Sequence, residues 1–410
     1  MLGEDLLSVH ADVTFDETIE NVETHIHLPY GSPNYGNADE IRIAIMNQDL
    51  AVLPSASSLR VVGRLTKDNG IDKLDSTDFI NFGICHLFES ISYELNGVQI
   101  DHCKNVGVTA TLKALVSASP SQKNALENAG LYLPSETINN ENGYFDVNIP
   151  LKMLLGFAED YPRIVIHCKH ELVPMRSNSD NNAVRTISNK VIPVAERFRV
   201  IISSIQWLMP YIKISDRKKV ALYKTITEHH PKALSFRSWD LFTYPTLPTT
   251  SKLVWPIKTS NFLEKPRFVI IAFQTGRQNS SLKDSSEFDR CSLRDVKLFL
   301  NSQSYPYHEL HIDFDRNQFS NLYNMYCQFQ KSYYGRESEP FLSKSDFSTH
   351  CVIVLDCSRQ NEAMKSSTVD IRLEIEAHDN FPANTSCYAL ILNDKIVDYF
   401  PLSGIVTKRI

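Results

Sequence analysis

Residues 59–66 read LRVVGRLT, and residues 267–275 read RFVIIAFQT. Each stretch is apolar enough for a buried strand. Each also leads through a polar turn to a similar acidic segment, DSTDF at 75–79 and DSSEF at 284–288. The second member of each pair follows the first by roughly 200 residues, so the series keeps its order and its spacing. We therefore predict that the chain contains two copies of one structural unit.

The similarity continues beyond these segments. An alternating strand ends in LNG at residues 95–97 and in LNS at residues 300–302. An Ile-Asp pair follows in both halves, at residues 100–101 and 312–313, and a helix comes next. Asn, Gly and Ser at such places are typical of strand ends and turns. The repeat thus indicates a shared architecture and no shared chemistry.

Short apolar segments bounded by Gly, Pro, Asn and Ser recur along the whole chain. Many short strands separated by turns favour a sandwich or barrel over alternating strands and helices. Helical patterns are few, and those at residues 109–116 and 317–332 occupy matching places in the two halves. The sequence predicts an all-β fold of two tandem sandwiches. Its predicted strands include residues 41–46, 59–65, 90–95, 163–168, 198–202, 268–273, 296–300, 352–356, 369–375 and 388–392.

A single helix is predicted between the two sandwiches. Ser215 and Asp216 suit its N-terminus, apolar residues follow at helical spacing, and Pro231 comes shortly after its end. We assign residues 1–214 to an N-terminal unit with an acidic arm over about residues 1–20, 215–230 to the linking helix, and 231–410 to a C-terminal unit with a basic tail.

The composition of the 410 residues narrows the functional classes. A formal net charge of −6 argues against a protein that coats nucleic acid, which would need many cations to replace counterions. No run of 18 apolar residues predicts a membrane span, and the N-terminus lacks the pattern of a signal peptide. Eight scattered cysteines without a close CxxC pair favour reduced thiols inside a cell.

His25 and His27 are the most conspicuous candidate metal ligands. They lie two apart on a predicted strand, so both side chains face the same way, as in a bicupin metal site. The remaining ligands of such a site are missing from the neighbouring sequence, and the second half has no matching pair. Partly exposed strand histidines are the better interpretation.

Further Cys, His and Asp residues are weaker candidates for a functional site. A structural zinc would need alternate residues of adjacent Cys-His pairs, which point to opposite faces of a strand. Buried thiols and surface imidazoles explain them adequately, and an aspartate before the second helix is expected to cap it. No GxSxG, HExxH, P-loop or GxGxxG motif occurs, so we predict no enzyme, cofactor or metal site. The residues concerned are Cys85, His86, His102, Cys103, His167, Cys168, His170, Asp313 and Asp315.

Several long segments resemble the double jelly-roll major capsid proteins of Polinton (Maverick) elements and of related adintovirus-like viruses. They are SYELNGVQID at 92–101, YPRIVIHCKHELVPMRS at 161–177, IQWLMPYIKISDRKKVALYKTI at 205–226, CSLRDVKLFLNSQSYPYHELHIDFD at 291–315 and VIVLDCSRQNEAMKSSTVDIRLEIE at 352–376. The resemblance is strongest in the second half and carries no catalytic residues.

The resemblance implies two tandem jelly rolls and a structural role in an icosahedral shell. Three chains would form a homotrimeric capsomer with six sandwiches, which suits sixfold packing. Neighbouring capsomers, a vertex (penton) protein and minor capsid proteins are the implied partners, in virions assembled inside the host cell. The alternatives are a carbohydrate-binding or carbohydrate-active jelly roll and, less favoured, the bicupin enzyme.

Overall fold

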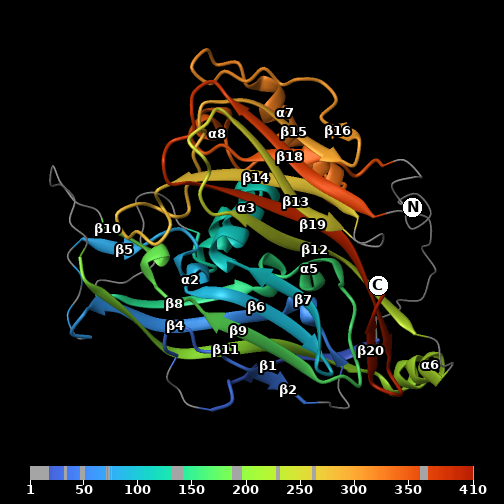
Figure 1. Cartoon of the computed structure of the whole chain (residues 1–410). Coiled ribbons are helices and arrows are strands. Elements are labelled where there is room, and N and C mark those ends of the chain that lie inside the picture. The colour runs from blue at the N-terminus through green and yellow to red at the C-terminus, as the bar shows by residue number, and fades with distance from the viewer. Residues whose placement is uncertain are drawn as a thin grey trace, which may run out of the picture.

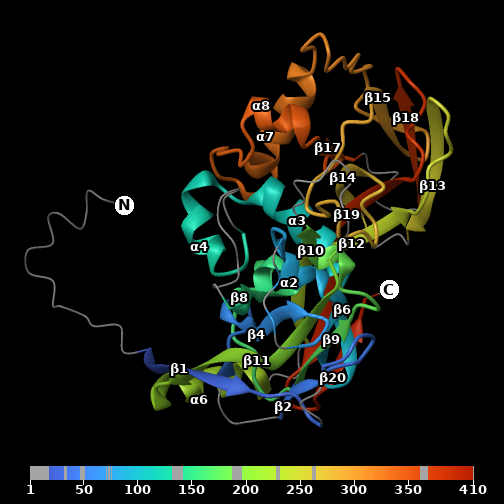
Figure 2. The same cartoon turned by 90° about the vertical axis from the view of Figure 1, so that its left-hand side faces the viewer.

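The computed structural model describes residues 18–409 except 32–34, 47–50, 71, 73, 75, 132–141, 187–195, 228–230, 261–264 and 361–367. The chain forms two β-sandwiches, and Figure 1 shows the N-terminal one below the C-terminal one. In the turned view of Figure 2, four helices of the two halves lie along one flank. These are α3 (Val106–Ser117), α4 (Lys123–Glu127), α7 (Ser320–Tyr334) and α8 (Lys344–Thr349).

The N-terminal sandwich consists of two antiparallel sheets with the strand orders β1-β11-β4-β8 and β2-β9-β6-β7. Beside them, β3 (Ala51–Val52) pairs with β11, and β5 (Thr77–Phe79) pairs with β10 (Val184–Thr186). The sheet strands are β1 (Ile19–His27), β2 (Ile43–Ile45), β4 (Ser58–Lys67), β6 (Phe88–Leu95), β7 (Val98–Lys104), β8 (Tyr144–Pro150), β9 (His170–Arg176) and β11 (Phe198–Ile214).

The C-terminal sandwich has the strand orders β12-β19-β14-β17 and β13-β18-β15-β16, and β20 (Ile405–Lys408) pairs with β19. Its strands are β12 (Lys232–Tyr244), β13 (Lys252–Ser260), β14 (Pro266–Thr275), β15 (Leu293–Leu300), β16 (Gln303–Tyr305), β17 (Ile353–Asp356), β18 (Val369–Ala377) and β19 (Thr385–Phe400).

The two sandwiches share one connectivity. Taken in chain order, the sheet strands of the first half take the same places in their sheets as β12 to β19 take in the second. Eight strands in two such antiparallel sheets make a jelly roll. The quoted repeat at residues 59–66 and 267–275 corresponds to β4 and β14. The predicted all-β double jelly roll is confirmed.

One predicted strand is wrong. Residues 163–168 contain bends and a single bridge, between Val165 and Val52, and the strand begins only at His170. His167 has a φ of 54°, which interrupts an extended chain, so its apolar neighbours reach the core without forming a strand. The helix predicted at residues 317–332 begins slightly later, at Ser320.

The segment between the sandwiches contains α6 (Asp216–Thr227), where the sequence predicts a linking helix. At the C-terminus, Lys408 ends β20, and the Arg409 guanidinium donates two hydrogen bonds to Asp398, at 2.7 and 2.9 Å. The basic tail is thus held on the sheet, as far as residue 409. The acidic arm lies outside the described residues up to residue 17. No helix among the described residues is long and apolar enough to span a membrane.

The hydrophobic core of each sandwich contains side chains from the other half of the chain. Leu234 and Phe236 of β12 belong to the core cluster of the N-terminal sandwich. In return, Leu112 and Val116 of α3 belong to the core cluster of the C-terminal sandwich. Each sandwich is therefore completed by side chains from the other.

Replacing Ile270 by Ala is expected to lower the free energy of unfolding by about 2–5 kcal/mol, because its fully buried side chain would leave a cavity in the core of the C-terminal half. The measurement is the midpoint of urea unfolding. Ile405→Ala removes an exposed side chain from β20 and should change stability by about 0.5 kcal/mol or less. Equal effects of the two variants would contradict the placement of the core.

Candidate functional site

The junction between the two sandwiches contains a dense cluster of buried polar contacts. Helix α5 (Gly156–Asp160) of the N-terminal half lies against β12 of the C-terminal half (Figure 1). A Cβ at Gly156 would lie 1.8 Å from the backbone oxygen of Arg237, so only glycine permits this approach. The Asp160 carboxylate accepts a hydrogen bond from the Arg237 backbone N–H at 2.8 Å. Helix α5 thereby covers the edge of β12 that β19 leaves open.

The side chains of Arg237 and Asp160 strengthen this contact. The guanidinium donates two hydrogen bonds to the carboxylate, at 2.7 and 2.6 Å. It also donates to the backbone oxygen of Tyr333 at 2.7 Å and lies 3.6 Å from the centre of that ring. Burial alone would lower the pKa of Arg237, but the hydrogen bonds and charge of Asp160 raise it, so the guanidinium stays charged.

Glu159 connects three further elements. Its carboxylate lies 2.6 Å from the ammonium of Lys113 on α3, a side chain that is only 4% exposed. It accepts hydrogen bonds from the Trp239 indole N–H of β12 at 3.2 Å and from the Tyr334 hydroxyl of α7 at 2.6 Å. A buried carboxylate is tolerated when its lone pairs are filled in this way. One side chain of α5 therefore holds elements of both halves.

Helices α3 and α7 also meet directly. The Tyr326 hydroxyl of α7 donates to the Leu115 backbone oxygen at 2.6 Å, and the Gln330 amide donates to the Ala118 oxygen at 2.9 Å. These bonds satisfy carbonyls near the C-terminal end of α3, which have no partner inside the helix.

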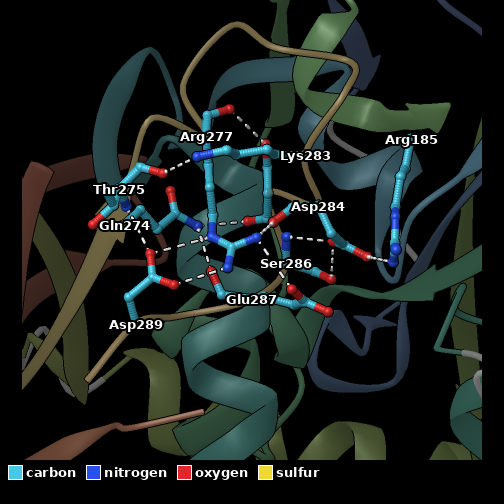
Figure 3. A network of polar contacts seen from close by, with 10 residues as sticks. Arg185, Gln274, Thr275, Arg277, Lys283, Asp284, Ser286, Glu287 and Asp289 are labelled. Carbon is cyan, nitrogen blue, oxygen red and sulfur yellow. Dashed lines mark hydrogen bonds and ion pairs between the residues drawn. The ribbon is translucent and has the colours of Figure 1, made fainter. Parts of the chain in front are cut away.

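A second polar contact between the halves involves the loop after β14. Figure 3 shows Arg277 at its centre, donating to Asp289 at 2.8 Å and to Glu287 at 3.1 Å. Its guanidinium also donates to the backbone oxygen of Asp284 at 3.0 Å. The aligned carboxylates and backbone groups give the loop a fixed shape.

This loop contacts the N-terminal half at β10. The Asp284 carboxylate lies 3.7 Å from the Arg185 guanidinium, as Figure 3 shows. The Thr186 backbone N–H donates to the Ser281 backbone oxygen at 2.7 Å, and the Asn181 amide donates to Asn279 at 3.1 Å. The relative position of the sandwiches is thus fixed by two separate sets of bonds.

Arg237→Ala is expected to destabilise the protein by about 3 kcal/mol, because it leaves the Asp160 carboxylate in the junction without its partner. Urea unfolding measures the change. Arg60→Ala removes a comparably bidentate but exposed pair with Asp146 and should cost about 1 kcal/mol or less. The double variant with Asp160→Ala should lose less than the sum of the single changes. Strict additivity would refute the coupling.

The candidate metal ligands His25 and His27 both contact the ring of Tyr211. The His25 imidazole stacks on Tyr211 with ring centres 4.3 Å apart and lies 3.2 Å from Glu23. The His27 imidazole shares a hydrogen bond of 3.0 Å with the Tyr211 hydroxyl. Within the described residues, no group of three or more His, Cys, Asp or Glu side chains is placed to hold a metal ion.

The other Cys and His candidates lie in the packed interior for the most part. The strand assignment of Cys85 and His86 is wrong, because both belong to the short helix α2 (Gly83–His86). His102 and Cys103 do lie on β7. Cys168 is buried, and the His167 ring contacts Tyr223 of α6. All eight cysteines are free thiols, and burial raises the pKa of Cys103 and of Cys168 to about 12.

His170 is the clearest of the buried histidines. Its Nδ1 lies 2.7 Å from the Tyr93 hydroxyl, and only 1% of the residue is exposed. Burial lowers the pKa of His170 from 6.5 to about 3, because a charged imidazole would lose its hydration. The folded protein therefore keeps this ring neutral at pH values where the unfolded chain protonates it.

Because the pKa of His170 is lower in the folded protein than in the unfolded chain, the free energy of unfolding should decrease at acidic pH. The contribution of the neutral His170 is fully present above pH 6.5 and is lost as the pH falls from 6.5 towards 3, by up to about 1.4 kcal/mol per pH unit. In His170→Gln, the unfolding free energy measured between pH 7 and pH 4.5 should fall less steeply. His308→Asn alters an exposed ring and serves as the control. Parallel curves for His170→Gln and the native protein would contradict the assignment.

Asp313 and Asp315 do not cap the helix, contrary to the prediction. Helix α7 begins at Ser320 with Phe319 before it. Asp313 instead accepts a hydrogen bond from the Arg316 backbone N–H at 3.0 Å, within a turn. Asp315 is 84% exposed and pairs with Arg290 at 3.0 Å. Each carboxylate has its own partner.

A polar cleft of about 1100 Å³ lies where loops of both halves approach each other. Two of the carboxylates that line it, those of Asp180 and Glu196, bond to neighbouring segments of the chain. Asp180 pairs with Arg176 at 2.8 Å. Glu196 accepts hydrogen bonds from Ser76 at 3.2 Å and from Thr77 at 3.0 Å. These two carboxylates therefore already have partners within the chain.

Comparison with known proteins identifies the architecture. Residues 78–397 match the family described as "Double jelly roll-like domain". The Sputnik virophage structure solved by cryo-EM has a TM-score of 0.67 at 10% identity, over 99% of this chain and 92% of that one. The PBCV-1 virus capsid has a TM-score of 0.60 at 11% identity, over 98% and 99% of the two chains. The mavirus major capsid protein has 0.58 at 10% identity, over 98% and 92%. No curated protein sequence matches.

Proposed function

Because the chain belongs to the double jelly roll-like domain family, we propose that it is the major capsid protein of a virus or virus-like transposon. The observation that carries the proposal is the pair of sandwiches with one strand order, held together by a bonded junction. The backbone resembles viral capsid chains over nearly its whole length. Its role is structural and non-enzymatic, in the shell of the particle.

Three copies of such a chain form a capsomer. Two similar sandwiches at a fixed angle supply one third of a ring of six, so a threefold oligomer presents a nearly sixfold outline. A hexagonal outline lets identical capsomers tile a flat facet. The junction at α5 and β12 supports this function because the angle between the sandwiches determines whether the ring closes.

The finer assignments extend the same proposal. The segments quoted from the sequence resemble those of Polinton (Maverick) and adintovirus-like capsid proteins, and this resemblance supports assigning the chain to that type. We divide the chain into an N-terminal jelly roll (residues 1–214), a linker that contains α6 (215–230) and a C-terminal jelly roll (231–410). The partners of the chain are neighbouring capsomers, a vertex protein and minor capsid proteins, with no strong direct binding of nucleic acid. It is made and assembled inside the host cell and resides in the virion capsid.

The oligomeric state tests the proposal. Light scattering after gel filtration should give three times the chain mass of 46.7 kDa, and negative-stain microscopy should show hexagonal particles. The expected trimer needs no added metal or cofactor. A stable monomer would overturn the proposal, and a monomer retained on a glycan column would favour a carbohydrate-binding jelly roll.

A further inference from the structure

We propose that the acidic arm of residues 1–17 binds the basic helix α6 of the same chain and covers its first turn. Both partners belong to one chain, so this contact forms whether or not the protein assembles into capsomers. Its support comes from the charges of the two segments and from the place where the arm joins the fold.

Three cationic side chains follow one another in the first turn of α6. Arg217 and Lys218 are exposed, and the partly exposed Lys219 lies 5.8 Å from the centre of the Tyr223 ring. Within the part of the chain that the structure describes, neither Arg217 nor Lys218 forms an ion pair with a carboxylate. Cations at the beginning of a helix repel the positive end of its dipole, so α6 gains no stability from them. An acidic partner would explain their position.

An exposed apolar side chain lies beside these cations. Val220, the next residue of α6, is 57% exposed. Figure 1 shows the helix at a corner of the molecule, close to the C-terminal strand β20. A partner that fits this surface should therefore combine negative charge with apolar side chains.

The arm has this composition. Residues 1–17 read MLGEDLLSVHADVTFDE, with five carboxylates and no Lys or Arg. Leu, Val and Phe lie between the acidic residues. Opposite charges draw the two segments together, and burial of apolar surface against Val220 adds a contribution that salt does not screen.

The antiparallel pairing of β1 with β11 leads the arm to α6. The Ser215 backbone N–H, just before the helix, donates to the Thr18 backbone oxygen at 3.2 Å. Because the two strands run in opposite directions, the chain before Thr18 leaves the sheet where α6 begins, and Figure 2 shows α6 beside this end of β1. An ion pair of 2.9 Å between Glu20 and Lys213 already joins the two strands next to this point.

The arm is long enough to cover the helix. Its 17 residues can extend over about 60 Å, whereas the 12 residues of α6 span about 18 Å. A short tether also keeps the arm near α6 at an effective concentration on the order of millimolar. Weak ion pairs therefore suffice to hold the arm, and the arm of a second copy competes poorly.

Carbodiimide cross-linking tests the contact directly, because this reagent joins carboxylates to lysine amines that touch. Mass spectrometry should find bonds between residues 1–17 and Lys218 or Lys219, in a product that migrates as a single chain. The ion pair of Glu20 with Lys213 is the internal control. A linked control without a linked arm would overturn the proposal. So would arm-to-helix bonds found only in products of twice the chain mass, because the arm would then bind a second copy.

Trypsin cleavage after residues 217–219 tests the charge dependence. The variant Asp16→Asn/Glu17→Gln should be cleaved there about fivefold faster than the native protein, because two ion pairs of the arm are lost. The variant Glu337→Gln/Asp379→Asn is the matched control, because it removes two exposed carboxylates from the C-terminal sandwich, and it should be cleaved at the native rate. Equal rates for all three proteins would contradict the proposal.

Discussion

The contact of α5 with β12 fixes how the two sandwiches are joined, and the rest of the architecture depends on it. Gly156 lets the helix approach the strand backbone, and Asp160 then binds both the backbone and the side chain of Arg237. Adjacent Glu159 adds α3 and α7 to the same cluster. Buried carboxylates contribute stability only while their partners stay in place, which favours one arrangement over slightly rotated ones. The proposed capsid function would require that property, because a small error in the angle between the sandwiches would prevent a ring of subunits from closing.

The exchange of core residues makes the two units interdependent. Leu234 and Phe236 are buried in a sandwich to which their own strand does not belong, and α3 supplies Leu112 and Val116 in the other direction. Separating the halves would expose these side chains, at roughly 25 cal/mol for each Å² of apolar surface. The chain is therefore better described as one folded unit with an internal repeat than as two independent domains joined by a linker.

Periodic patterns in the sequence predict those features of the fold that are determined by residues close together along the chain, such as strands and helices. The alternation in β6 and β15 and the helical stripe of α7 are of this kind, and so is the duplication. Position-specific backbone conformations were not predictable, such as the φ of 54° at His167 that ends an apolar run without a strand. The pairing of Arg237 with Asp160 was also beyond reach, because the two residues are 77 positions apart and no local pattern links them. Because a helix follows Asp313, the sequence predicts that this residue caps the helix. The Asp313 carboxylate instead accepts a hydrogen bond from the Arg316 backbone N–H in the turn that precedes the helix.

The two copies of the unit differ most where their surroundings differ. The large side chain of Phe236 on β12 is covered by the N-terminal sandwich, where it meets the Phe157 ring. The outward residues of β1 are exposed to water in the single chain. They include smaller aliphatic residues, Val22 and Ile26, with Glu23 and the other polar residues of β1 between them. Interspersed charges of this kind restrain edge strands from unwanted pairing. Duplication thus leaves one edge strand, β12, packed within the chain and its counterpart, β1, with exposed side chains.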